Sequence, residues 1–152
     1  MTDIKPLGEP GFFRHYPASQ TIPLKENRSE YRFQPLSPKQ VTVYKVDKGI
    51  FKDNIKKCDW LLLNFTDNQG YLIELKGGNI SLAIDQLNLT LDRLANTLRS
   101  SMTGIKLFCR VVGRDGSGSN YRKEKVKALE KRMARLGGTY EFQSQKFIER
   151  IP

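Results

Sequence analysis

The chain has 152 residues, of which 38% are hydrophobic and 28% are charged, a composition typical of one globular domain and not of a disordered chain. Its 26 Lys and Arg residues outnumber its 16 Asp and Glu residues, giving a formal net charge of +10. This surplus favours a polyanionic partner, nucleic acid before an anionic membrane, although a basic surface can also serve solubility alone. The sequence has no stretch long and apolar enough to span a membrane and no signal peptide, so we expect no membrane partner.

The rare residue types exclude several mechanisms. Cys58 and Cys109 have no metal-ligand spacing, so we expect two buried free thiols, as in a cytoplasmic protein. His15 is the only histidine, which excludes a Ser/His/Asp or Cys/His mechanism and a histidine-rich zinc site. The stretch GRDGSGSNYRK lacks the spacing of a nucleotide-binding phosphate loop.

Residues 1–38 contain many prolines and polar residues, with scattered aromatic side chains in no clear period. This pattern predicts a loop-rich arm, with at most a short helix near Leu24 to Tyr31.

Three strands are predicted next. QVTVYKV (40–46) alternates and is β-branched, and CDWLLLNF (58–65) and YLIELKGG (71–78) are apolar runs. The stretch TDNQG between the last two is typical of a hairpin loop, because Asn and Gly adopt left-handed backbone conformations. The three strands are therefore expected to form an antiparallel meander.

The hydrophobic period then changes to that of helices. Apolar residues from Ile80 to Leu98 recur at the spacing of one helix face, and Asn79 or Ser81 could cap its start. IKLFCRVVG (105–113) predicts a central strand, and residues 121–136 predict a second helix that ends at Gly137 and Gly138. The tail TYEFQSQKFIERI predicts one or two short strands.

The order of elements is therefore three strands, a helix, a strand, a second helix and short strands. It predicts one α/β (α+β) domain over residues 1–152, in which helices flank a mixed β-sheet. The βββαβ core covers residues 40–113, and residues 121–152 add the basic helix and the C-terminal strands.

Glu74 and Lys76 are candidates for a chemical site. Residues two apart on a strand project from the same face, so their carboxylate and ammonium groups point the same way. The hairpin would bring Asp59, at the start of the preceding strand, next to Glu74. Carboxylate oxygens suit Mg²⁺, which can polarise a phosphodiester and acidify an attacking water. The alternatives are that Asp59 caps a turn and that Glu74 and Lys76 form an ordinary same-face ion pair.

The stretch CDWLLLNFTDNQGYLIELKGG, followed by AIDQL, resembles the PD-(D/E)XK nuclease superfamily. The resemblance covers residues 40–113 and implies a restriction-endonuclease-like βββαβ core. It implies that Asp59, Glu74 and the carbonyl of Leu75 bind Mg²⁺ or Mn²⁺, that Lys76 completes the E-x-K pair, and that Gln86 is the glutamine near the site in some branches.

The sequence departs from the family pattern before Asp59, where Cys58 replaces proline. Some branches also have a glutamate on a helix before the first core strand, for which Glu26 and Glu30 are both candidates. Gln86 lies outside the apolar face of the first predicted helix, so the alternative is that its side chain is simply exposed to solvent.

Basic side chains that could hold a nucleic-acid backbone lie on both predicted helices, on the predicted strand 105–113 and in the loop after that strand. They are Arg93, Arg110, Arg114, Arg122, Lys123, Lys127 and Lys131. The alternative is a solvated basic face, with Arg93 as an ordinary surface arginine.

Together these patterns predict a Mg²⁺-dependent deoxyribonuclease that hydrolyses phosphodiester bonds in DNA, in defence of a bacterium or phage, repair or junction resolution. A homodimer or a protein partner would supply specificity. The alternative is a non-catalytic module on the same fold that binds nucleic acid or protein.

Overall fold

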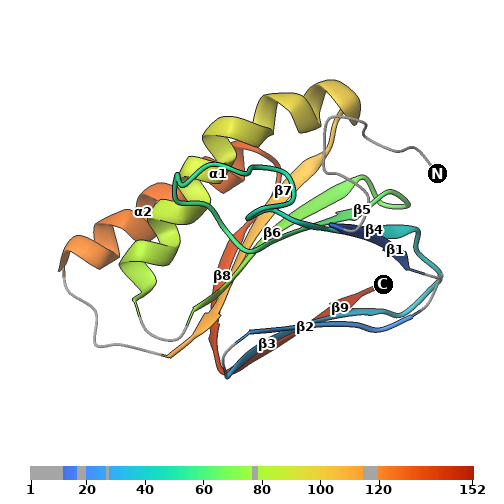
Figure 1. The fold of residues 1–152 in the computed structure, drawn as a ribbon, viewed down its shortest axis with the longest axis horizontal. Coiled ribbons are helices and arrows are strands. Elements are labelled where there is room, and N and C mark those ends of the chain that lie inside the picture. Colours follow the sequence, from blue (N-terminus) through green and yellow to red (C-terminus); the bar gives the residue numbers. More distant parts are fainter. Residues whose placement is uncertain (1–11, 17–19, 27, 77–78, 115–119) are drawn as a thin grey trace.

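The structure is a computed structural model, and it describes residues 12–16, 20–26, 28–76, 79–114 and 120–152. The side chains of Lys76 and of residues 120–122 are outside this description. The described residues form three layers (Figure 1). Two helices cover one face of a six-stranded sheet, and a three-stranded sheet covers its other face.

The large sheet combines antiparallel and parallel pairs. Its strands are β1 (Phe13–Tyr16), β4 (Val41–Lys45), β5 (Trp60–Asn64), β6 (Gln69–Lys76), β7 (Lys106–Gly113) and β8 (Tyr140–Ser144). They lie in the order β1-β4-β5-β6-β7-β8, antiparallel up to β6 and parallel from β6 to β8.

The small sheet joins residues from both ends of the chain. It consists of β2 (Ile22–Glu26), β3 (Ser29–Pro35) and β9 (Lys146–Ile151), in that order. Strand β3 is antiparallel to β2 and parallel to β9.

The central strands are covered on both faces, which explains their continuous apolar runs. Leu61 and Leu63 pack toward the helices, whereas Leu62 between them packs against the small sheet. In β6, Leu72 faces the helices, and Ile73 faces the small sheet.

The two helices are α1 (Ile80–Ser101) and α2 (Asn120–Arg135). The Asn79 side chain caps α1 by accepting a hydrogen bond of 3.0 Å from the Leu82 amide. Lys125 joins α2 to Asp85 near the start of α1, and Arg132 joins it to Asp92 farther along. The two helices therefore run side by side and begin at the same end of the sheet.

The structure confirms the mixed α/β class and the order of elements predicted from residue 40 onward. It also confirms that Cys58 and Cys109 are buried free thiols. In the described part of the chain, no helix has the length and hydropathy needed to cross a membrane.

The prediction for residues 1–38 is wrong in the described part of that segment. The expected short helix at Leu24 to Tyr31 is a β-hairpin of β2 and β3, and β1 precedes it. Ile22 and Leu24 alternate with exposed residues, as Tyr31 and Phe33 alternate with half-buried ones, so each strand buries one face against the large sheet.

Candidate functional site

The predicted acidic residues meet where β5 begins and β6 ends. The last pair in the register of these strands is Trp60 with Ile73, so Asp59 and Glu74 are the next residues across the hairpin. The Asp59 Oδ2 atom accepts a hydrogen bond of 2.8 Å from the amide of Leu75. The expectation that Asp59 lies near the end of β6 is therefore confirmed.

Glu74 is a buried carboxylate in the middle of the large sheet, with 1% of its surface exposed. It pairs with Val111 of β7 and shares the helix-facing side of β6 with Leu72. Burial first, and then the charge of Glu74, raises the pKa of the Cys58 thiol. Such a carboxylate is costly to bury without compensating polar or positive groups.

Glu26 brings a further carboxylate to Asp59 from the small sheet. It is the last residue of β2 and forms a side-chain hydrogen bond with Asp59. Burial, together with the charge of Asp59, raises the pKa of Glu26 to about 7. Glu30 instead forms an ion pair of 2.9 Å with Arg32. Of the two glutamates that the sequence left open, the structure places Glu26 at the site, on strand β2 and not on the helix that the family pattern implies.

Two side chains of α1 fix the backbone that precedes Asp59. The Gln86 Nε2 atom donates a hydrogen bond of 2.9 Å to the carbonyl of Lys57. The Thr90 hydroxyl accepts one of 2.9 Å from the Cys58 amide and donates one of 2.8 Å to the Gln86 carbonyl. Gln86 is half-buried, and its contact in this structure is with the backbone next to the site. Gln86 and Thr90 therefore hold the backbone that leads to Asp59.

Lys76 ends β6 opposite Gly113, but its side chain lies outside the described residues. Its predicted partnership with Glu74 thus stays a prediction.

The donor chemistry of the site suits a magnesium ion, because carboxylate oxygens come from Glu26 at the end of β2, Asp59 just before β5 and Glu74 in β6. As they stand, however, the described residues contain no group of three His, Cys, Asp or Glu side chains that could hold a metal ion. The carboxylates would have to move closer together to share an ion.

Some of the basic side chains predicted to contact phosphates are exposed, and others form ion pairs within the chain. Arg114, Lys123, Lys127 and Lys131 are exposed. Arg114 directly follows the residue that pairs with Lys76, so it lies at the same end of the sheet as the carboxylates. The side chain of Arg122 is outside the described residues.

Arg93 and Arg110 both form ion pairs with other residues of the chain. Arg93 forms a two-point pair with Asp53, at 2.6 and 3.1 Å, and lowers the pKa of Asp53 to about 2 by hydrogen bonding. Its guanidinium also lies 3.6 Å from the ring centre of Phe51. Arg110 is 3% exposed and bonds Glu149 at 2.6 Å, so the expectation that Arg110 meets a nucleic-acid backbone is wrong.

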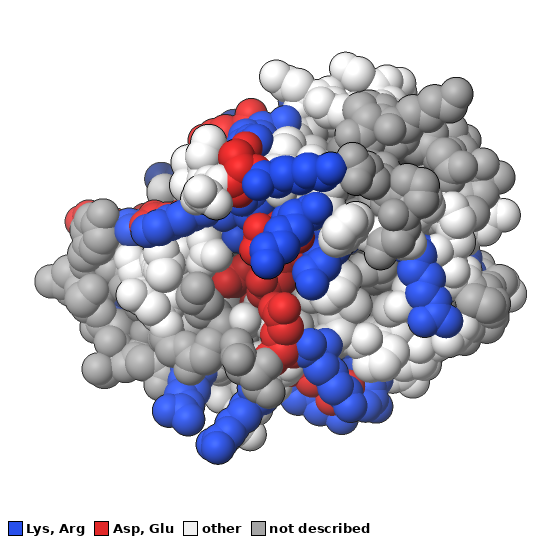
Figure 2. All heavy atoms as spheres, in the orientation of Figure 1, with Lys and Arg blue, Asp and Glu red and all other residues white. Residues whose placement is uncertain are grey.

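One face of the molecule has a simple arrangement of charged side chains. Figure 2 shows acidic side chains gathered in the middle of this face, with Lys and Arg side chains around them.

In comparisons with protein-family models, with curated proteins and with solved structures, no match to this chain was found.

Proposed function

We propose that the protein is a metal-dependent nuclease that hydrolyses phosphodiester bonds in DNA. The observation that carries this proposal is the meeting of Asp59 with the Glu74–Leu75 segment, where the Asp59 carboxylate holds the Leu75 amide at 2.8 Å. Residues that the sequence pattern links across a hairpin are thus in contact in the fold.

The arrangement of elements supports the same proposal. Strands β4, β5 and β6, helix α1 and strand β7 follow one another in the βββαβ order of restriction-endonuclease-like cores. Strand β6 pairs with β5 up to Ile73 and with β7 as far as Lys76, so Glu74 lies on a strand of the large sheet that β7 holds in place. The carboxylates therefore have a rigid support, which a catalytic site requires.

In this proposal Asp59, Glu74 and the carbonyl of Leu75 hold Mg²⁺ or Mn²⁺, and Glu26 adds a third carboxylate. A bound ion would polarise the phosphodiester and acidify the attacking water. Lys76 positions that water through its ammonium group, in keeping with the E-x-K pattern. Gln86 and Thr90 keep Asp59 in place through the backbone of residues 57–58.

The substrate contacts and the setting complete the proposal. Arg114, Lys123 and Lys127 would hold phosphates beside the site, and Lys131 extends the row along α2. A second copy of the chain or a protein partner would add specificity. The two buried free thiols agree with a cytoplasmic location, in defence, repair or junction resolution.

The test is cleavage of labelled single-stranded, duplex and branched DNA with Mg²⁺, with Mn²⁺ and with EDTA. Asp59→Asn, Glu74→Gln and Lys76→Ala should each lower the cleavage rate by at least about a hundredfold. Glu130→Gln and Lys106→Ala are the matched controls, because both residues are exposed and lie outside the proposed site. Circular dichroism confirms that each variant is folded.

Two outcomes would contradict the proposal. One is the absence of cleavage by the native chain with either metal. The other is cleavage that persists unchanged in Glu74→Gln and Lys76→Ala, which would indicate a contaminating nuclease.

The second candidate is a non-catalytic module that binds nucleic acid or protein. It is favoured by the lack, among the described residues, of three metal-ligating side chains close enough to hold an ion. It predicts binding without cleavage, no thermal stabilisation by Mn²⁺, and no effect of Lys76→Ala.

A further inference from the structure

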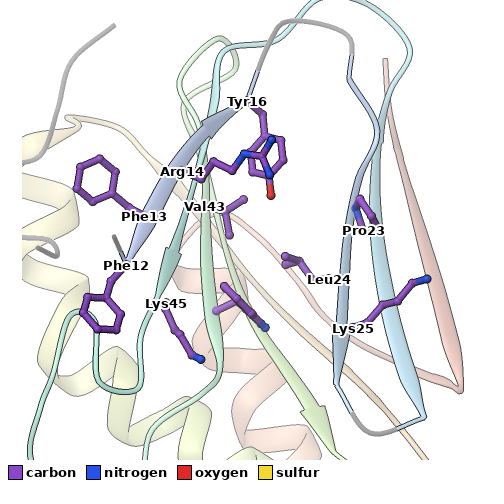
Figure 3. A pocket seen from close by; sticks show the side chains of 10 residues that line it. Phe12, Phe13, Arg14, Tyr16, Pro23, Leu24, Lys25, Val43 and Lys45 are labelled. Carbon is purple, nitrogen blue, oxygen red and sulfur yellow. The ribbon is translucent and has the colours of Figure 1, made fainter. Parts of the chain in front are cut away.

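A groove separates the edge strand of the large sheet from the edge strand of the small one. It has a volume of about 380 Å³ and lies between β1 and β2 (Figure 3). In the described part of the chain, β1 pairs only with β4, and β2 pairs only with β3. The small sheet thus leaves part of the large sheet uncovered, and the floor of the groove includes Val43 and Trp60.

Aromatic rings and cations line this groove together. The rings belong to Phe12, Tyr16 and Trp60, and the cations are Arg14, Lys25 and Lys45, whereas the Phe13 ring points away from β2 toward the helix-facing core. The described residues that line it include no carboxylate.

The cations lie close to the rings. The Arg14 guanidinium is 4.7 Å from the centre of the Tyr16 ring, and the Lys45 Nζ atom is 5.8 Å from that of Trp60. Arg14 and Lys25 are exposed, and Phe12 keeps 37% of its surface accessible. Positive charges and part of the Phe12 ring are therefore accessible to a ligand, and the half-buried rings of Tyr16 and Trp60 lie beside cations that a phosphate could draw away from them.

One end of the groove reaches the candidate site. Glu26 and Asp59 share a side-chain hydrogen bond. Lys25 directly precedes Glu26, and Trp60 directly follows Asp59. The charge of Lys45 also acts on Glu26, whose pKa it lowers against the larger effect of burial. A ligand lying in the groove would thus extend to the carboxylates.

Rings interleaved with cations form the kind of surface that binds a single strand of nucleic acid. Bases stack on aromatic side chains, and Lys and Arg neutralise the phosphates between them. A duplex presents its phosphates but keeps its base faces stacked, so it would leave the aromatic rings unused. The groove is also near the lower end of the range of about 300–1,000 Å³ for small-ligand sites, which suits unpaired nucleotides.

We propose that the groove between β1 and β2 binds unpaired nucleotides of a nucleic-acid strand and leads that strand to Glu26 and Asp59. As an assignment of substrate class, this inference rests on the proposed nuclease function. The binding step itself can be measured without cleavage.

Trp60 is the only tryptophan of the chain, so its fluorescence reports directly on the groove. Short oligothymidylate, oligouridylate and duplex DNA are titrated into the full chain in EDTA, and binding is measured in parallel by anisotropy of labelled strands. We expect the single strands to quench Trp60 and to bind more tightly than the duplex. Comparing the two oligonucleotides distinguishes DNA from RNA.

The variant Arg14→Glu/Lys25→Glu reverses two exposed charges of the groove. It should raise the Kd for the single strand by at least about tenfold, because phosphate contacts dominate such affinities. Lys106→Glu is the matched control, because it reverses an exposed charge opposite Gln69, at the far end of β6 from Lys76. Lys123→Glu/Lys127→Glu tests the competing surface on α2.

The inference is overturned if the duplex binds as tightly as the single strand, or if no nucleic acid changes the fluorescence of Trp60. It is also overturned if the α2 variant loses single-strand binding and the groove variant keeps it. Failure of the nuclease proposal looks different, because the single strand then binds in the groove but no metal supports its cleavage. If Arg14→Glu/Lys25→Glu binds and cleaves the single strand as well as the native chain does, the groove inference is wrong and the nuclease proposal still stands.

Discussion

Glu26 is a surface-strand glutamate whose environment favours its protonated form. Burial and the neighbouring Asp59 raise its pKa from 4.5 to about 7. A carboxyl whose pKa is higher in the folded state holds a proton that the unfolded chain has already lost. Its contribution to stability is therefore most favourable below pH 4.5 and declines as the pH rises toward 7.

This decline of stability with rising pH leads to a prediction for Glu26→Gln, which keeps the shape of the side chain but never carries a negative charge. The native chain should lose thermal stability relative to Glu26→Gln as the pH rises from about 5 to about 8. Melting temperatures of both chains across this range measure the difference. Glu130→Gln, an exposed control, should follow the native chain, and parallel curves for the native chain and Glu26→Gln would contradict the prediction.

Individual site residues differ in how far the sequence predicts them. Asp59, Glu74 and Leu75 belong to one hairpin, so strand alternation and a short loop suffice to bring them together. Glu26 comes from a second sheet, and no local pattern indicates that its neighbour is Asp59. The choice between Glu26 and Glu30 requires the packing of the two sheets.

Helix α1 holds the candidate site through side chains that do not reach its carboxylates. The Thr90 hydroxyl satisfies the buried amide of Cys58, one residue before Asp59. Thr90 is fully buried, so water cannot replace its hydroxyl as the acceptor for the Cys58 amide when Thr90 is substituted.

Thr90→Val should lower the free energy of unfolding by about 1–3 kcal/mol, because the buried amide of Cys58 loses its acceptor. Cleavage at saturating metal should fall as well, while the affinity for a single strand in EDTA stays that of the native chain. Urea denaturation and the cleavage assay measure the two effects. Thr97→Val on the same helix is the control, and equal stability of the two variants would contradict the role of Thr90.

Elements with a strong hydrophobic period are predicted well, and those with weak amphipathic patterns are not. Buried apolar positions at helical spacing define α1, and the continuous apolar runs define β5 and β7. Strands β2 and β3 bury only alternate residues, and prolines and charges between them obscure the period. Pro23 is compatible with β2 because this strand forms an edge of its sheet.

At the scale of the molecule, one buried ion pair connects the two sheets. Arg110 of β7 bonds Glu149 of β9 at 2.6 and 3.3 Å and also donates to the Thr139 carbonyl. Its guanidinium lies between 5.3 and 5.6 Å from the ring centres of Tyr71, Phe108 and Phe147. The pair therefore fixes the small sheet at one place on the large one.

Arg110→Ala removes the cation from the largely buried Glu149 carboxylate and leaves it the Tyr31 hydroxyl as a hydrogen-bond donor, so it should lower the free energy of unfolding by about 3–5 kcal/mol. Urea denaturation followed by circular dichroism gives this value. Arg114→Ala, four residues along the chain and exposed, should change it by less than about 0.5 kcal/mol. A similar small change for Arg110→Ala would show that the ion pair does not hold the sheets together.

The parallel pairing of β3 with β9 also has a consequence for the order in which the protein is made. Tyr31 and Glu149, which share a hydrogen bond of 3.1 Å, are 118 residues apart in the chain. A two-stranded hairpin such as β2–β3 is marginal by itself, so the small sheet must wait for β9 to leave the ribosome. Asp59 and Glu74 can be in place long before that moment, whereas Glu26 cannot. A nascent chain would thus carry two of the three candidate carboxylates, and the third would join them once β9 has emerged.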